Sequence, residues 1–118
     1  MWTYTISTGV IAENGALRGT GYSGRGEGRD NPALVHAKGK GPLPPGKYRF
    51  GAAYAHPKLG PVCMNLEPLP GTEVFGRSLF RIHGDNDAND ASHGCLVTGP
   101  GVRRAMAAAR DRILDVKA

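Results

Sequence analysis

The residues of this chain that could do chemistry gather in one segment, 80–97, with the sequence F-R-I-H-G-D-N-D-A-N-D-A-S-H-G-C-L-V. It holds a thiol at Cys95 and imidazoles at His83 and His93. A free thiol has a pKa of about 8.5, so a nucleophilic cysteine needs a base that takes its proton at neutral pH. A nearby histidine can do this and yield a thiolate–imidazolium pair that attacks carbonyl carbons. The segment therefore predicts acyl transfer through a cysteine.

The elements around these residues are expected to bring the thiol beside one imidazole. Residues 80–83 alternate between apolar and polar side chains, which is typical of a strand with His83 on the face opposite the core. Gly84 allows a sharp exit from that strand. The loop 85–90 contains only Asp, Asn and Ala, which are turn-forming or small residues. A loop this short returns Cys95 beside the strand end that carries His83.

These positions suggest a role for each group. Cys95 is the candidate nucleophile and His83 the candidate general base. Backbone N–H groups at Gly94 and Cys95 are candidates to hold the oxyanion of a tetrahedral intermediate, because a glycine lets substrate approach the backbone. The group that orients His83 is left open: a backbone carbonyl such as that of Gly84 is one candidate, and the Asp85 carboxylate is a weaker one.

Two other interpretations of the segment remain open. His83, Asp85, His93 and Cys95 are all competent zinc ligands, although H-x-D and H-x-C are not common structural zinc spacings and no C-x-x-C is present. A zinc assay separates a metal site from a thiol enzyme. The simplest alternative is that the histidines and the cysteine are ordinary polar residues near a loop.

Composition limits the architecture to one domain, residues 1–118. The 18 Gly and 9 Pro favour short strands and turns over a helical bundle. A net charge of +5 favours anionic partners, but no Lys/Arg block or aromatic–basic pattern marks a nucleic-acid site. Two cysteines are too few for a disulfide framework. Cys63 is expected to face away from its apolar neighbours or to be buried, and a Cys63–Cys95 disulfide would disable the nucleophile.

Local patterns predict the individual elements. Alternation indicates a first strand at 2–6, and Asn14-Gly15 predicts a type I′ hairpin between 10–12 and 16–20. Further strands are expected at 34–36, 47–53 and 62–67, with a Gly-rich loop at 21–28 and a rigid Gly-Pro connector at 41–46. The segment 102–116 predicts one helix with a stripe of apolar residues, Val102, Met106, Ala109 and Ile113.

The sequence start, M-W-T-Y-T-I-S, has no basic region and no long apolar run. It therefore predicts neither a secretory signal peptide nor a membrane-inserted helix. On its own, this start indicates synthesis in the cytoplasm without a leader.

Several motifs together resemble the L,D-transpeptidase catalytic domain. The pair I-H-G and S-H-G-C, ending at Cys95, looks like the signature of that domain. Five further runs resemble its small versions delivered as type VI secretion effectors: G-Y-S-G at 21–24, D-N-P at 30–32, G-P-L-P-P-G-K-Y at 41–48, F-G-R-S at 75–78 and R-I-H-G-D at 81–85. The resemblance covers nearly the whole chain. It implies a mainly β, α+β fold: a small β-sandwich or open barrel with one C-terminal helix.

The resemblance also implies an activity. The substrate would be the tetrapeptide stem of peptidoglycan, cut between diaminopimelate and the terminal D-alanine through a thioester on Cys95, with no cofactor and no metal. Water would give a tripeptide, a free D-amino acid would exchange, and a second stem would cross-link. The partners would be peptidoglycan stem peptides, an immunity protein and a component of the secretion apparatus. The protein would be secreted and would act in the periplasm of a target cell.

Further site residues follow from the resemblance. Ser92 and Gly94 would shape the catalytic turn, and His93 would orient substrate or support the thiolate. The remaining candidates for substrate contact are Arg81, Asp85, Gly84, Tyr22, Ser23 and Arg103. Among these, Arg81 would bind a stem carboxylate and Asp85 an ammonium group of diaminopimelate.

Two expectations concern how this chain differs from larger relatives of that kind. The interval between His83 and Cys95 is short and leaves little chain for a long lid, so the thioester should be open to water. Hydrolysis or exchange is therefore expected over cross-linking. A binding module for the cell wall without catalysis is the alternative from another class of function, and full activity in a Cys95→Ala variant would favour it.

Overall fold

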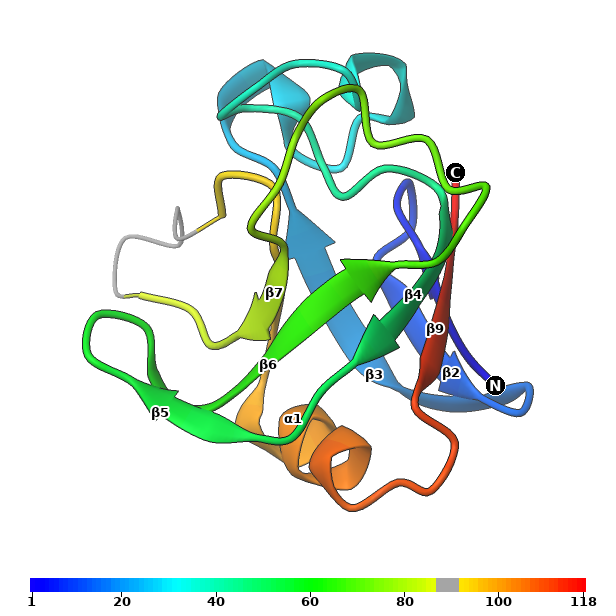
Figure 1. Cartoon of the computed structure of the whole chain (residues 1–118), viewed down its shortest axis with the longest axis vertical. Helices are drawn as coiled ribbons and strands as arrows, with labels where there is room; N and C mark the ends of the chain where they lie inside the picture. The colour runs from blue at the N-terminus through cyan, green and yellow to red at the C-terminus, as the bar shows by residue number, and fades with distance from the viewer. Residues whose placement is uncertain (87–91) are drawn as a thin grey trace.

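Short strands bounded by glycine and proline make up most of the chain, as the composition predicts. The computed structural model describes residues 1–86 and 92–118 (Figure 1). The strands in these residues are β1 Trp2–Thr5, β2 Val10–Glu13, β3 Ala16–Ser23, β4 Gly46–Phe50, β5 Tyr54–His56, β6 Gly60–Pro68, β7 Arg81–His83, β8 Leu96–Thr98 and β9 Ile113–Lys117. One α-helix, α1 Pro100–Ala107, and two 3-10 turns, η1 Gly26–Gly28 and η2 Pro32–Leu34, complete this part of the chain.

The strands form a barrel that closes on itself. Within the described residues the order is β4-β9-β1-β2-β3-β8-β7-β6-β5, and β4 also pairs with β6, which closes a ring of eight strands and leaves β5 outside. Two neighbouring pairs are parallel, β1 with β9 and β7 with β8. The prediction of a small, mainly β domain with one helix near the C-terminus is confirmed, and the barrel is closed rather than open. Figure 1 shows α1 at one end of the barrel and the 3-10 turns at the other.

The barrel interior is filled by one apolar core. Alternate residues of each strand point inward, so Trp2 and Tyr4 of β1 lie beside Leu114 and Val116 of β9, and all four are buried. The Tyr48 and Phe80 rings meet edge to face, with centroids 5.9 Å apart. The core positions predicted at the start of segment 80–97 are confirmed, because Phe80 and Ile82 are buried.

The N-terminal hairpin forms as the sequence predicts. Asn14 and Gly15 both have positive φ, 49° and 84°, which is the backbone of a type I′ turn. β2 and β3 pair from Val10 with Thr20 to Glu13 with Ala16. β3 runs further than expected, to Ser23, so the first residues of the predicted Gly-rich loop belong to the barrel, and η1 occupies its end.

The strand predicted at 34–36 is wrong. The Asn31 side chain accepts a hydrogen bond from the N–H of Ala33, and Pro32 stands at the first position of η2, so both residues favour a helical turn there. The strands predicted at 47–53 and 62–67 are confirmed with shifted ends, as β4 and β6, and β5 was not predicted.

The predicted helix is real but ends much earlier than expected. α1 stops at Ala107, and Ile113–Lys117 forms β9 between β1 and β4. The Arg112 guanidinium donates hydrogen bonds to the carbonyls of Met106, Ala107 and Ala109, at and just beyond the helix end. It also bonds the carbonyls of Phe50 and Gly51 in the neighbouring strand segment. The Arg112 side chain therefore ties the helix end to a strand segment that is distant in the chain. The apolar stripe of residues 102–113 had predicted a longer helix.

The loop expected at 85–90 lies only in part within the described residues, because residues 87–91 fall outside them. Its two flanks, Asp85 and Ser92, are described and belong to the site below. None of the helices in residues 1–86 and 92–118 is long and apolar enough to cross a membrane.

Candidate active site

The parallel pair β7–β8 places the thiol and the imidazole at one end of the barrel wall. Ile82 pairs with Leu96 and His83 with Val97, and Cys95 directly precedes β8. His83 and Cys95 line the same cleft, which has a volume of about 310 Å³. The other lining residues are Leu59, Ser78, Leu79, Phe80, Arg81, His93 and Gly94. The expectation that these elements bring Cys95 near His83 therefore agrees with the observed fold.

Cys95 is partly exposed, and its thiol approaches the carbonyl oxygen of Leu79 at 3.7 Å. Burial raises the pKa of this thiol above its usual value. The backbone N–H of Arg81 and the guanidinium groups of Arg81 and Arg77 lower the same pKa in part. Burial thus disfavours the thiolate in the free protein.

His83 is buried at the end of β7, and its Nδ1 lies 2.8 Å from the carbonyl oxygen of Gly84. Because a carbonyl only accepts, Nδ1 carries the hydrogen and Nε2 is left as the basic nitrogen. The structure thus supports the carbonyl of Gly84, rather than the carboxylate of Asp85, as the orienting group. Burial lowers the pKa of His83, the Gly84 carbonyl opposes this, and the charges of Arg103 and Arg81 lower it further.

The two pKa directions differ from the thiolate–imidazolium pair expected from the sequence. A raised pKa at Cys95 and a lowered pKa at His83 both favour a neutral thiol beside a neutral imidazole. In such a pair the imidazole takes the thiol proton as the sulfur attacks, rather than beforehand. The physical cause is the burial that the barrel wall imposes on both groups.

Two buried serines fix the backbone at the nucleophile. The Ser92 hydroxyl donates to the carbonyl oxygen of Cys95 at 2.7 Å and accepts from the N–H groups of Gly24 and Gly94 at 2.8 and 3.2 Å. The Ser23 hydroxyl donates to the same carbonyl at 2.9 Å and accepts from Leu43 N–H at 2.7 Å. These bonds fasten the turn before β8 to β3 and to the Gly-Pro connector.

Arg77 is a site residue that sequence reasoning missed. Its guanidinium is buried and donates to the carbonyls of Val35, Pro42 and Gly41 at 2.6–2.8 Å. Gly94 packs directly on this group, because a Cβ built at Gly94 would lie 2.2 Å from Nη2 of Arg77. The only sequence signal for Arg77 was its place in the F-G-R-S run, and that run does not indicate that its side chain is buried.

Arg103 supports the other side of the site. It is buried, and it donates through Nε to Thr98 O at 3.0 Å and through Nη1 to Pro61 O at 2.7 Å. A Cβ at Gly84 would lie 2.8 Å from its Nη2, so the guanidinium packs against Gly84, directly after His83 at the end of β7. Two of its nitrogens are therefore engaged with backbone in the barrel rather than presented to a ligand.

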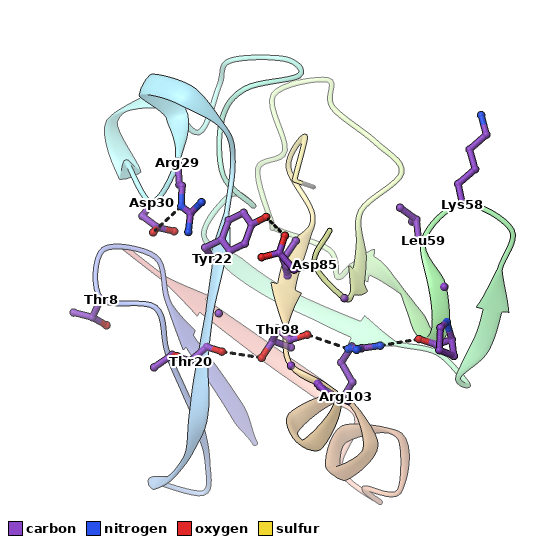
Figure 2. Close-up of a pocket in the computed structure, with 17 residues that line it drawn as sticks. Thr8, Thr20, Tyr22, Arg29, Asp30, Lys58, Leu59, Asp85, Thr98 and Arg103 are labelled. Atoms are coloured by element: carbon purple, nitrogen blue, oxygen red, sulfur yellow. Dashed lines mark hydrogen bonds and ion pairs between the residues drawn. The ribbon is translucent and has the colours of Figure 1, made fainter. Parts of the chain in front are cut away.

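The other residues predicted to contact substrate lie in the cleft wall or next to it. Arg81 lines the cleft and donates from Nε to the Tyr54 hydroxyl at 3.0 Å. His93 is exposed, also lines the cleft and lies 3.4 Å from the Arg25 guanidinium. Asp85 lies outside the cleft wall and accepts a hydrogen bond from another predicted residue, Tyr22, at 2.6 Å (Figure 2).

The donors of the zinc alternative do not assemble. Among residues 1–86 and 92–118, no three His, Cys, Asp or Glu side chains lie close enough together to hold a metal ion. Both cysteines are free, so the Cys63–Cys95 disulfide is not formed. Cys63 is buried and packs as a small apolar residue, one of the two placements expected for it.

Comparison with known families decides the class of this protein. The model of the Tlde1 domain matches residues 18–116. The chain belongs to the Tlde1 domain family. This is a family of type VI secretion effector domains, which supports the assignment of the protein as a secreted toxin and suggests a cognate immunity protein and a secretion apparatus as its partners. No curated protein matches the chain at a significant level.

Proposed function

We propose that this Tlde1 domain is a cysteine-dependent peptidoglycan enzyme that acts on tetrapeptide stems between diaminopimelate and the terminal D-alanine. The observation that carries the proposal is the shared cleft of Cys95 and His83, within an I-H-G and S-H-G-C pair that resembles the L,D-transpeptidase signature. The basic charge of the chain, +5, suits a substrate that carries carboxylates.

The first half-reaction forms a thioester. Sγ of Cys95 attacks the carbonyl carbon at the L-centre of diaminopimelate while Nε2 of His83 takes the thiol proton. The oxyanion of the tetrahedral intermediate is held by the backbone N–H of Cys95, because the other N–H expected from the sequence, that of Gly94, already donates to Ser92. The intermediate collapses as the C–N bond breaks, and the imidazolium returns its proton to the amine of the departing D-alanine.

The second half-reaction releases the enzyme. His83 takes a proton from water or from the amine of a free D-amino acid as that group attacks the thioester carbonyl, and the C–S bond breaks to restore the thiol. Water gives a tripeptide stem, and a D-amino acid gives an exchanged tetrapeptide. The short interval between His83 and Cys95 leaves the thioester open, so we propose hydrolysis and exchange over cross-linking.

The test is mass spectrometry of purified tetrapeptide muropeptides after incubation with the protein, with and without an added D-amino acid. Cys95→Ala removes the nucleophile, and Cys63→Ala removes the other thiol as a matched control. We expect loss or replacement of D-alanine with the unmodified protein and with Cys63→Ala, and neither with Cys95→Ala.

Three other results of this experiment would count against the proposal. Trimming that persists in Cys95→Ala would refute the thioester route. Unchanged muropeptides, with the protein folded and the thiol reduced, would favour the wall-binding alternative. A mixture dominated by cross-linked dimers would refute the preference for water and D-amino acids.

A further inference from the structure

A large cavity in the described residues is separate from the nucleophile. It has a volume of about 900 Å³, and Cys95 and His83 are not among the residues that line it. Figure 2 shows it between β3, the end of β8, the start of α1 and the tip of the β5–β6 hairpin, where Lys58 and Leu59 stand. Its volume lies within the range of about 300–1,000 Å³ that is typical of ligand pockets.

This cavity is connected to the catalytic cleft. A smaller cavity of about 300 Å³ shares Lys58, Leu59, Gly84 and Asp85 with the large one. The same smaller cavity shares Leu59 and His93 with the cleft that holds the thiol. The three hollows therefore adjoin one another, with Leu59 in the wall of each, so a ligand anchored at Cys95 that passes Leu59 reaches the large cavity.

The wall of the large cavity is polar and held in place. The Tyr22 hydroxyl donates to Asp85 at 2.6 Å, and the Arg29 guanidinium stacks on the Tyr22 ring at 3.7 Å (Figure 2). Asp30 accepts a hydrogen bond from Ser23 N–H at 3.1 Å and lies 3.9 Å from Arg29. Both carboxylates of the wall thus already have partners within the protein, which disfavours a cationic ligand.

The rest of the lining suits hydroxyl and amide groups. Three threonines, Thr8, Thr20 and Thr98, contribute to it, and four glycines expose backbone instead of side chains. The cavity is larger than a single amino acid such as D-alanine needs, and its lining combines these polar groups with Leu59, Pro61, Val97 and Pro100, which suits both the hydroxyl groups and the apolar faces of sugar rings. A hydroxyl-rich ligand of two rings fits both its size and its lining.

We infer that the large cavity binds the N-acetylated disaccharide that carries the stem in peptidoglycan, an inference that rests on the proposed function. With the scissile bond at Cys95, the stem occupies the smaller cavity on its way to the sugar. Lys58 lines both cavities, and with Arg25 in the smaller one it faces the carboxylate of the glutamate residue in the stem. The enzyme then prefers stems attached to glycan over free peptides.

Gly99 provides a variant that fills the cavity. It lines the cavity, its backbone is extended at φ −70° and ψ 167°, and an added Cβ would meet no heavy atom within 4 Å. Gly99→Phe is therefore free of backbone strain. Gly101→Phe adds the same side chain two residues further along, where a Cβ also meets nothing and the cavity is not reached.

The first experiment compares kcat/KM for the disaccharide-tetrapeptide and for the same tetrapeptide without sugar. We expect Gly99→Phe to lower the value for the disaccharide substrate about tenfold, which corresponds to about 1.4 kcal/mol, and to leave that for the free tetrapeptide unchanged. Gly101→Phe should change neither. Equal values for both substrates with the unmodified protein, or an equal loss on both with Gly99→Phe, would overturn the inference.

A second experiment does not depend on catalysis. The disaccharide alone is titrated into the Cys95→Ala variant and followed by NMR, with Gly99→Phe added to the same variant for comparison. Saturable shifts at Thr20, Tyr22 and Thr98 that disappear with Gly99→Phe would support the sugar site even if the stem were never cut. Absence of binding, with stems still trimmed by the unmodified protein, would overturn the sugar site and leave the proposed function intact.

Discussion

Replacing Ser92 with alanine tests whether the hydroxyl network holds the nucleophile. The Ser92 side chain is buried, and its hydroxyl accepts from two backbone N–H groups, those of Gly24 and Gly94. Alanine fits the same space but leaves both donors without that acceptor. The Cys95 carbonyl, in contrast, keeps its bond from Ser23 at 2.9 Å.

The magnitude follows from these two donors. A buried N–H without a partner costs about 1–3 kcal/mol, so the pair costs about 2–6 kcal/mol, a large share of the roughly 5–15 kcal/mol that stabilises a domain. At about 2.1 cal/mol/K per residue, a chain of 118 residues unfolds with an entropy of about 0.25 kcal/mol/K. A loss of about 3 kcal/mol then lowers Tm by about 12 °C.

Ser23→Ala provides an internal scale, because the Ser23 hydroxyl accepts from one N–H, that of Leu43. We expect it to cost about half as much as Ser92→Ala, and we expect Ser7→Ala, at an exposed serine, to cost nothing measurable. Calorimetry gives the three Tm values, and alkylation of Cys95 reports whether the nucleophile has moved. A shift below 2 °C for Ser92→Ala, or a larger shift for Ser23→Ala, would refute the reasoning.

Two further predictions concern buried charge. Because burial lowers the pKa of His83 below its unfolded value of about 6.5, the unfolded chain binds more protons, and stability should fall as the pH drops below about 6.5. Denaturation at pH 7.5 and 5.5 should show a smaller loss in His83→Gln, and an equal loss would contradict the assignment. Arg77→Lys should cost about 2–4 kcal/mol, because a lysine cannot bond the same three carbonyls from beside Gly94. Thermal melts should show no such loss in Arg18→Lys, at an exposed ion pair, and similar melts for both variants would contradict the role of Arg77.

Local signals predicted much of the barrel. The turn at Asn14-Gly15 needs positive φ at both residues, which these two types adopt readily, so the first hairpin was found. The final strand was missed, because residues 102–113 carry a helical apolar stripe. Pairing of β9 with β1 and β4, and the hydrogen bonds from Arg112 to the distant carbonyls of Phe50 and Gly51, overrule that local preference.

The candidate site likewise has features that the sequence indicated and features that it did not. The sequence predicted that Cys95 returns beside His83, and it left the orienting group open between a backbone carbonyl and the Asp85 carboxylate. In the fold, Cys95 and His83 line one cleft, and Nδ1 of His83 lies beside the carbonyl of Gly84. The burial of Arg77 beside Gly94 was not predicted, since its partners lie 35 to 42 residues away in the chain.

The sequence by itself determined which groups can react, because a thiol and imidazoles within one short segment are a matter of residue type and spacing. Only the tertiary structure decided their ionisation. The barrel wall buries His83 and covers Cys95 in part, and loss of water favours the neutral form of each. The large cavity also arises only in three dimensions, because its wall joins β3, the β5–β6 hairpin and the start of α1, which are far apart in the chain and meet when the barrel closes.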